Sequence, residues 1–148
     1  GDFVTMDFGC VYEGYCSDMT RTVAVGRVSD EQRAVYDVVL KAQRAACEAI
    51  RPGVTGQQAD AAARDIIAAA GYGRYFGHAL GHGVGLEIHE APTANPRSIE
   101  VLDKNMLITI EPGIYLPKKF GVRIEDLSIV GDSAIINLVT SEKELIIL

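Results

Sequence analysis

The spacing of apolar residues along this 148-residue chain is strand-like near both ends and helical in between. Residues 3–9 and 15–25 alternate between apolar and polar positions, and the turn around Tyr12, Glu13 and Gly14 joins them into a predicted β-hairpin. Two segments with helical spacing follow, and then a glycine-rich segment and further strand-like segments. This order predicts an α+β fold in which helices cover one face of a curved antiparallel sheet.

Both predicted helices begin with a capping box, in which a Ser or Thr and a Gln three residues later bond reciprocally to the backbone. The first helix starts at Ser29 and ends at residues 51–53, and the second starts at Thr55 and ends at Gly71. The apolar faces are expected to comprise Val35, Val38, Val39, Ala42, Ala46 and Ile50 in the first helix, and Ala59, Ala62, Ile66, Ile67 and Ala70 in the second.

Three strand-like segments follow the glycine-rich segment and a polar loop at residues 92–96. Residues 105–116 and 121–130 are expected to form strands joined by a turn, and residues 134–140 are expected to form a further strand. The chain therefore has a second predicted hairpin late in the sequence.

The early hairpin carries one acidic residue on each arm, Asp7 and Asp18. If the loop consists of residues 13–14, Asp7 lies opposite Thr20 and Asp18 is its diagonal neighbour. If the turn is shifted by one residue, the two acids lie directly opposite each other. Both registers place the two carboxylates on one face of the hairpin.

The late hairpin also carries an acid on each arm, and Glu111 and Glu125 pair if its turn is centred near Lys118. All four acids lie among apolar strand residues. A buried carboxylate without ionic compensation would protonate, so a divalent cation is the natural partner for such a group.

All three histidines lie within residues 78–89, among several glycines. Each histidine taken singly is typical of a filler in a glycine-rich turn, but the three together with the acids indicate a site. The glycines disfavour a helical zinc pair of His78 and His82. A dinucleotide-binding loop and a nucleophile elbow are also disfavoured, because the flanking strand and helix that each requires are missing.

Composition narrows the class of protein further. The formal net charge of −6 argues against nucleic acid as a partner. Cys10, Cys16 and Cys47 form no Cys-x-x-Cys pair, so a cytoplasmic location is expected. No apolar run approaches the roughly 18 residues of a membrane span, so no membrane association is expected. The start at Gly1 rather than Met suggests the interior of a longer protein.

The donor types narrow the choice of metal. Four carboxylates with one or two imidazoles and no thiolate suit Mn, Co, Fe or Zn. Four acids around one ion would carry too much negative charge, so two ions fit better. Two neighbouring ions can share a bridging hydroxide, lower the pKa of water to about 7 and polarise a carbonyl. The sequence therefore predicts metal-dependent amide hydrolysis.

Five motifs together resemble the complete ligand signature of the pita-bread (creatinase/aminopeptidase-like) dinuclear metallopeptidases, in the Xaa-Pro aminopeptidase and Xaa-Pro dipeptidase (prolidase) branch. The motifs are Asp7 in Met-Asp-Phe-Gly, Asp18 in Ser-Asp-Met-Thr-Arg-Thr, His82 in Gly-His-Gly-Val-Gly, Glu111 in Ile-Glu-Pro-Gly-Ile-Tyr and Glu125 in Val-Arg-Ile-Glu-Asp.

The resemblance implies two divalent ions, with Mn expected first and Co, Zn or Fe as alternatives. Asp7 would bind one ion, Asp18 and Glu125 would bridge both, and His82 with Glu111 would complete the second. Glu111 would also accept a proton from the bridging water. On the substrate side, His89 would hydrogen-bond the scissile carbonyl and His78 would lie near the prolyl group. Arg123, on the same strand face as Glu125, is a further candidate for substrate binding or for support of the ligands.

The implied activity is hydrolysis of the Xaa-Pro bond at the N-terminus of peptides or in dipeptides. The alternative is a catalytically inactive pita-bread module that binds peptides or protein partners. Residues 1–148 are expected to be the C-terminal portion of the catalytic domain. The family further suggests a homodimer for the full-length protein, and activity of these residues alone is an open question.

Overall fold

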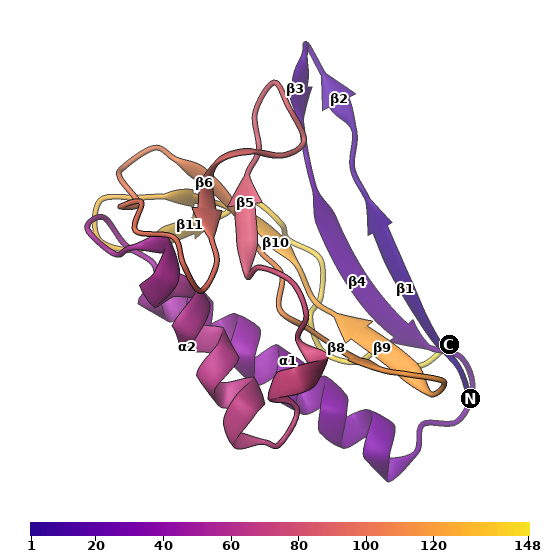
Figure 1. Ribbon diagram of the computed structural model, residues 1–148. Coiled ribbons are helices and arrows are strands. Elements are labelled where there is room, and N and C mark those ends of the chain that lie inside the picture. The colour runs from indigo at the N-terminus through magenta and orange to yellow at the C-terminus, as the bar shows by residue number, and fades with distance from the viewer.

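The computed structural model describes all 148 residues, and antiparallel strand pairs in it form a curved sheet with two helices on one face (Figure 1). The helices are α1 (Asp30–Ala49) and α2 (Gly56–Ala69), which lie side by side. The predicted α+β order of hairpin, two helices and further strands is present. Neither helix combines the length and the apolar character needed to cross a membrane.

The N-terminal hairpin comprises β1 (Phe3–Phe8), β2 (Val11–Tyr12), β3 (Tyr15–Cys16) and β4 (Met19–Ala24). Its loop is Glu13-Gly14, and both residues have positive φ (50° and 88°), as the tight turn of a twisted hairpin requires. Asp7 pairs with Thr20, so the first of the two predicted registers is confirmed and Asp18 is the diagonal neighbour of Asp7.

Both helices start as the sequence predicts, because Ser29 with Gln32 and Thr55 with Gln58 form complete capping boxes. The predicted face of α1 packs into the core, with Val38 only partly buried. The predicted face of α2 needs correction: Ala63 is fully buried, whereas Ala62 is half-buried and Ala70 is exposed. Because residues 61–63 are all alanines, the apolar pattern does not show which of them is buried.

The late hairpin differs from the prediction, because each of its long strands is interrupted. The first divides into β7 (Leu107–Ile110) and β8 (Gly113–Leu116), and the second into β9 (Phe120–Arg123) and β10 (Asp126–Val130). The prediction of continuous strands over residues 105–116 and 121–130 is therefore wrong. The remaining predicted strand is confined to β11 (Ile135–Asn137).

The interruptions have a physical cause at Pro112, which has no backbone N–H to donate, so the only bond left at this step is a long one from the Ile124 N–H to the Pro112 carbonyl (3.5 Å). The backbone N–H of Glu111 donates to the Leu80 carbonyl (2.8 Å), and that of Glu125 donates to the Thr20 carbonyl (3.0 Å). The two acids occupy a non-hydrogen-bonded pair of the hairpin, so both N–H groups point outward to flanking segments. Pairs on both sides of the break keep one register, centred on Lys118 with φ 63°, so Glu111 and Glu125 lie opposite each other as predicted.

The glycine-rich segment forms β5 (Gly81–Gly83), which follows the short 3₁₀ turn η1 (Gly73–Tyr75) and pairs with β6 (Glu90–Ala94). Part of the predicted polar loop at 92–96 is thus a strand. β5 lies so close to β7 that a Cβ on Gly81 would be 1.8 Å from the Thr109 carbonyl oxygen. Only glycine allows this approach.

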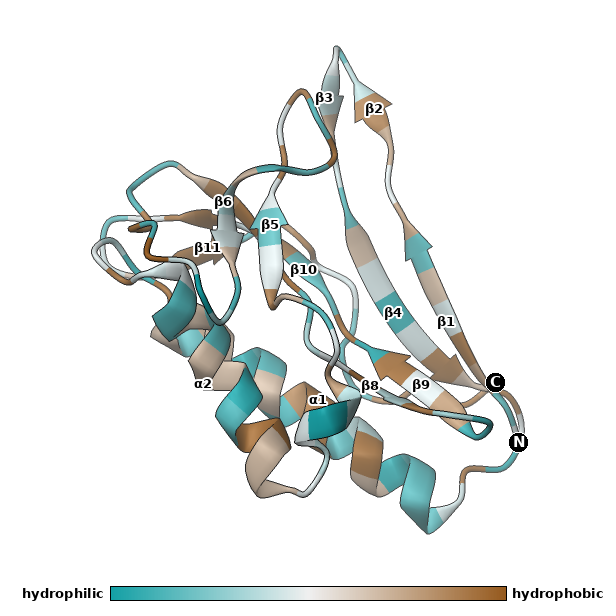
Figure 2. Cartoon of the chain, in the orientation of Figure 1, coloured by the Kyte–Doolittle hydropathy of each residue, from teal (hydrophilic) through white to brown (hydrophobic).

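The hydrophobic core lies between the helices and β7–β10, and not beneath the N-terminal hairpin. That hairpin projects away from the helices and carries exposed apolar side chains, among them Val4, Phe8 and Val11 (Figure 2). Its inner face points instead toward β5 and the late hairpin, where the acidic residues gather.

Candidate metal centre

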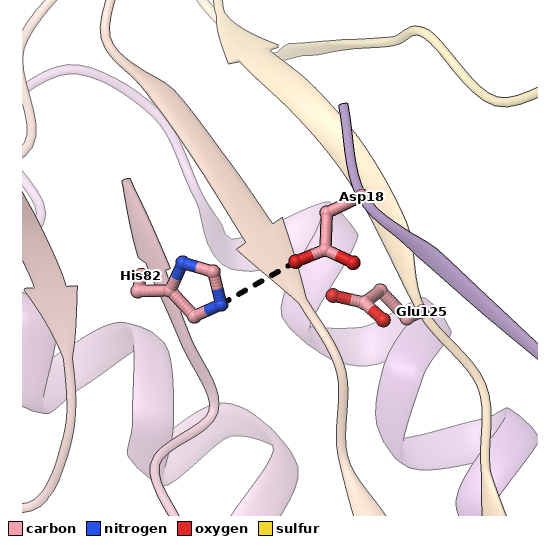
Figure 3. Close-up of side chains that lie close together, drawn as sticks. All are labelled: Asp18, His82 and Glu125. Atoms are coloured by element: carbon pink, nitrogen blue, oxygen red, sulfur yellow. Dashed lines mark ion pairs between the residues drawn. The ribbon is translucent and has the colours of Figure 1, made fainter. Parts of the chain in front are cut away.

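Three of the predicted ligands come together at one point between the strands. Asp18 immediately precedes β4, His82 is in β5, and Glu125 lies between β9 and β10. One ligand atom from each lies within 4.8 Å of the other two. Figure 3 shows the carboxyl groups of Asp18 and Glu125 side by side, with the imidazole of His82 facing them. Residues more than a hundred positions apart therefore form a single donor cluster.

Glu111 joins this cluster through His82. Its Oε1 lies 3.2 Å from His82 Nε2, and Asp18 Oδ2 lies 3.8 Å from the same nitrogen. On the other side of the ring, Nδ1 lies 3.0 Å from the Gly83 carbonyl oxygen. A proton on Nδ1 would satisfy that carbonyl and leave Nε2 free to bind a cation, which is the usual arrangement of a metal-binding histidine.

The electrostatics of the cluster show an excess of negative charge. Burial raises the pKa of Glu125 to about 8, and the Glu111 and Asp18 carboxylates add to this increase. Burial, followed by the nearby Asp7 carboxylate, raises the pKa of Asp18 as well. Burial alone would lower the pKa of His82, but hydrogen bonds to Glu111 and Gly83 raise it. A half-buried, oxygen-rich set with more carboxylates than cationic groups fits a divalent cation.

Asp7 lies outside the group of three. Its carboxylate pairs with the guanidinium of Arg123, and its side chain is 53% exposed. It still faces the site, because it pairs with Thr20 across the hairpin and its charge raises the pKa of Asp18. The structure thus places Asp7 at the rim of the cluster, paired with Arg123.

Arg123 connects several candidate residues. Its Nη1 donates to the hydroxyl of Tyr115 (3.0 Å), and the same hydroxyl lies 3.0 Å from His78 Nε2. Its Nε also lies 3.9 Å from Glu111 Oε2. The His78 ring is therefore linked to the acids through the Tyr115 hydroxyl and the Arg123 guanidinium.

His89 lies on the open side of the cluster. Its ring centroid is 4.1 Å from that of His82, and the residue is exposed. A molecule approaching the cluster from solvent could therefore contact His89 directly.

Two residues next to the ligands do not stand out in the sequence. The Thr20 hydroxyl bonds to Glu125, and the Thr109 hydroxyl bonds to Glu111. Each threonine lies two positions from a predicted ligand along the chain, Thr20 from Asp18 and Thr109 from Glu111. Side chains two residues apart in a strand share a face, and this rule could have identified both.

The comparisons with known proteins agree with the geometry. The sequence model of metallopeptidase family M24 matches residues 1–132. The Xaa-Pro dipeptidase of Pyrococcus horikoshii is 49% identical over 146 residues, which are 99% of this chain and 42% of that protein. The solved structure of an Xaa-Pro dipeptidase from Bacillus anthracis has a TM-score of 0.98 at 55% identity, over 99% of this chain and 41% of that one.

An X-Pro aminopeptidase structure from Thermotoga maritima has a TM-score of 0.96 at 43% identity, again over 99% of this chain and 41% of that one. The chain thus spans 41–42% of the length of these relatives. The predicted α+β pita-bread fold is confirmed. The assignment of residues 1–148 to the C-terminal portion of a catalytic domain stays a prediction.

Proposed function

Because this chain belongs to metallopeptidase family M24, we propose that it is part of an enzyme that hydrolyses Xaa-Pro bonds. The substrates would be dipeptides or the N-termini of longer peptides. The observation that carries the proposal is the convergence of Asp18, His82 and Glu125 from three separate parts of the sheet, with Glu111 Oε1 3.2 Å from Nε2 of the same imidazole. Relatives named as Xaa-Pro dipeptidases and as an X-Pro aminopeptidase support the choice of substrate.

The proposed cofactor is a pair of divalent ions, with Mn first and Co, Zn and Fe as alternatives. The proposed ligands are Asp7, Asp18, His82, Glu111 and Glu125. When bound, the ions would make water acidic enough to act as a nucleophile near neutral pH. Asp7 would have to exchange its contact with Arg123 for a cation, and its 53% exposure leaves room for that movement.

Side chains of this chain would accept the proton and orient the substrate. Glu111 is the proposed proton acceptor, because its carboxylate is close to His82 while remaining 15% exposed to the open side. His89 would donate a hydrogen bond to the scissile carbonyl oxygen from its exposed position beside His82. His78, held by Tyr115, would contact the prolyl side of the substrate. Arg123 would balance the charge of the acids.

The test uses the full-length protein after removal of bound metal. Hydrolysis of an Xaa-Pro dipeptide and an Xaa-Pro tripeptide should require added Mn²⁺ or Co²⁺, and should be lost in Asp18→Ala and His82→Ala. Asp37→Ala, which removes an exposed acid from α1, should retain activity. Cleavage that is insensitive to chelators would refute the proposal, and a protein that binds no metal near neutral pH would favour a non-catalytic binding module.

A further inference from the structure

Each glutamate of the cluster receives a hydrogen bond from a buried threonine hydroxyl. Thr20 Oγ1 lies 2.5 Å from Glu125 Oε2, and Thr109 Oγ1 lies 3.0 Å from Glu111 Oε1. Both threonines are 0% exposed. The two contacts come from different strands, β4 and β7, yet they repeat the same arrangement at the two acids that face each other in the late hairpin.

The direction of each hydrogen bond is determined by a second partner. Thr20 Oγ1 also lies 3.1 Å from Arg123 Nε, and Thr109 Oγ1 lies 3.0 Å from the backbone nitrogen of His82. Both of these nitrogens can only donate, whereas a hydroxyl has one proton and two lone pairs. Each hydroxyl oxygen therefore accepts from nitrogen, and its single proton is directed to the carboxylate. Hydrogen bonds from hydroxyl to carboxylate are strong, and the bond from Thr20 is the shorter of the two.

This arrangement leaves one oxygen of Glu125 available to a cation and fixes the orientation of the Glu111 carboxylate. Thr20 occupies Oε2 of Glu125, while Oε1 makes no hydrogen bond within the chain. In Figure 3 one carboxyl oxygen of Glu125 points toward His82 and Asp18. Thr109 bonds to both Glu111 and the backbone of His82, so it also aligns the ligand of β5 with the ligand that follows β7.

We propose that Thr20 and Thr109 are positioning residues, whose hydroxyls orient Glu125 and Glu111 for cation binding. This inference rests on the function proposed above and deepens it. Neither threonine is expected to contact the cation or the substrate. Loss of a group that orients a ligand typically weakens metal affinity about 10–100-fold, and that range is the expected effect of removing either hydroxyl.

Thr22 provides a matched control within the same strand. It is 1% exposed, but its hydroxyl donates to the Arg123 carbonyl oxygen (2.9 Å), accepts from the Arg123 N–H (3.2 Å) and lies near the Thr5 hydroxyl. It touches no carboxylate. Thr22→Val therefore removes a buried hydroxyl and its hydrogen bonds from β4 without changing the contacts of either glutamate.

The experiment is a calorimetric titration of metal-depleted full-length protein with Mn²⁺. Thr20→Val and Thr109→Val should weaken Mn²⁺ binding about 10–100-fold. Thr20→Ser and Thr109→Ser, which keep the hydroxyl, should bind within a few-fold of wild type, and Thr22→Val should match wild type. If a valine variant does not fold, the alanine variant of the same threonine replaces it in the comparison with serine.

Wild-type affinity in Thr20→Val and Thr109→Val would overturn the inference while leaving the proposed function intact. An equal loss of affinity in Thr22→Val would also overturn it, because a general effect on the sheet would then explain the result. Absence of binding of Mn²⁺, Co²⁺, Zn²⁺ and Fe²⁺ to the wild-type protein would overturn the proposed function and the inference together.

Discussion

Removal of the metal ions should make the stability of the protein fall as the pH rises from about 4.5 to about 8. Glu125 is the main cause: its pKa is about 8 in the folded protein, against 4.5 for a free glutamate side chain. The folded state therefore holds a proton that the unfolded chain releases in this interval. A group whose folded pKa is raised stabilises the fold fully below the unfolded pKa, and this stabilisation is lost as the pH rises through the folded pKa.

The magnitude follows from the same two values. Each pKa unit corresponds to about 1.4 kcal/mol, so the interval from 4.5 to about 8 corresponds to about 5 kcal/mol at most. Asp18 and His82 add to the effect, because both of their pKa values are raised on folding. Since whole proteins are stable by only about 5–15 kcal/mol, the loss should be large enough to measure.

The assay is urea unfolding of metal-depleted full-length protein at several pH values between 5 and 8. Glu125→Gln, which keeps the shape but cannot ionise, should be more stable than wild type at pH 8 and should show a flatter pH dependence. Mn²⁺ at about 100 times its Kd should restore about 2.7 kcal/mol to the wild type. Equal unfolding free energies for the metal-depleted wild type at pH 5 and pH 8 would refute the reasoning.

Two further predictions concern the support of the site. Arg21 and Asp126 form a buried ion pair (2.7 Å) behind Glu125, and Lys143 is a second partner of Asp126 (2.7 Å). Arg21→Ala should therefore cost more than about 1 kcal/mol of unfolding free energy but less than the about 3–5 kcal/mol of a fully uncompensated buried charge. Arg44→Ala, which breaks an exposed pair, should cost less than about 1 kcal/mol, and similar losses in denaturant titrations would contradict this contrast. Gly81→Ala would place a Cβ 1.8 Å from a backbone oxygen of β7 and should lower both the melting temperature and the affinity for Mn²⁺. Gly77→Ala, whose Cβ meets nothing within 4 Å, should leave both unchanged in thermal unfolding and calorimetry.

The elements that sequence predicts well here are those determined by neighbouring residues. The capping boxes of α1 and α2 involve side chains three positions apart, and the Glu13-Gly14 loop sets the register of the first hairpin by itself. The shared face of Asp7 and Asp18 follows from that register. Such local interactions can be inferred from sequence because their partners are separated by only a few residues.

The features that sequence does not predict depend on distant partners. The hydrogen bonds that join Glu111 to Leu80 and Glu125 to Thr20 link segments that are far apart along the chain. The contact of Asp7 with Arg123 likewise joins the two ends of the sequence. Pro112-Gly113 and the change of apolar phase at Glu125-Asp126 do mark a break in the strand pattern, but they do not identify the distant partners.

Outward hydrogen bonds of the late hairpin assemble the candidate site. Glu111 and Glu125 form a non-hydrogen-bonded pair of the antiparallel ladder, so their backbone N–H groups point away from each other toward flanking segments. Glu125 bonds to Thr20 of β4, and Glu111 bonds to Leu80 just before β5. Asp18 therefore lies on one side of the late hairpin and His82 on the other. The carboxylates thereby crowd together, which raises the pKa of Glu125 and opposes its ionisation. A divalent cation would relieve this repulsion, and metal binding should therefore stabilise the junction of the strands as well as supply the chemistry.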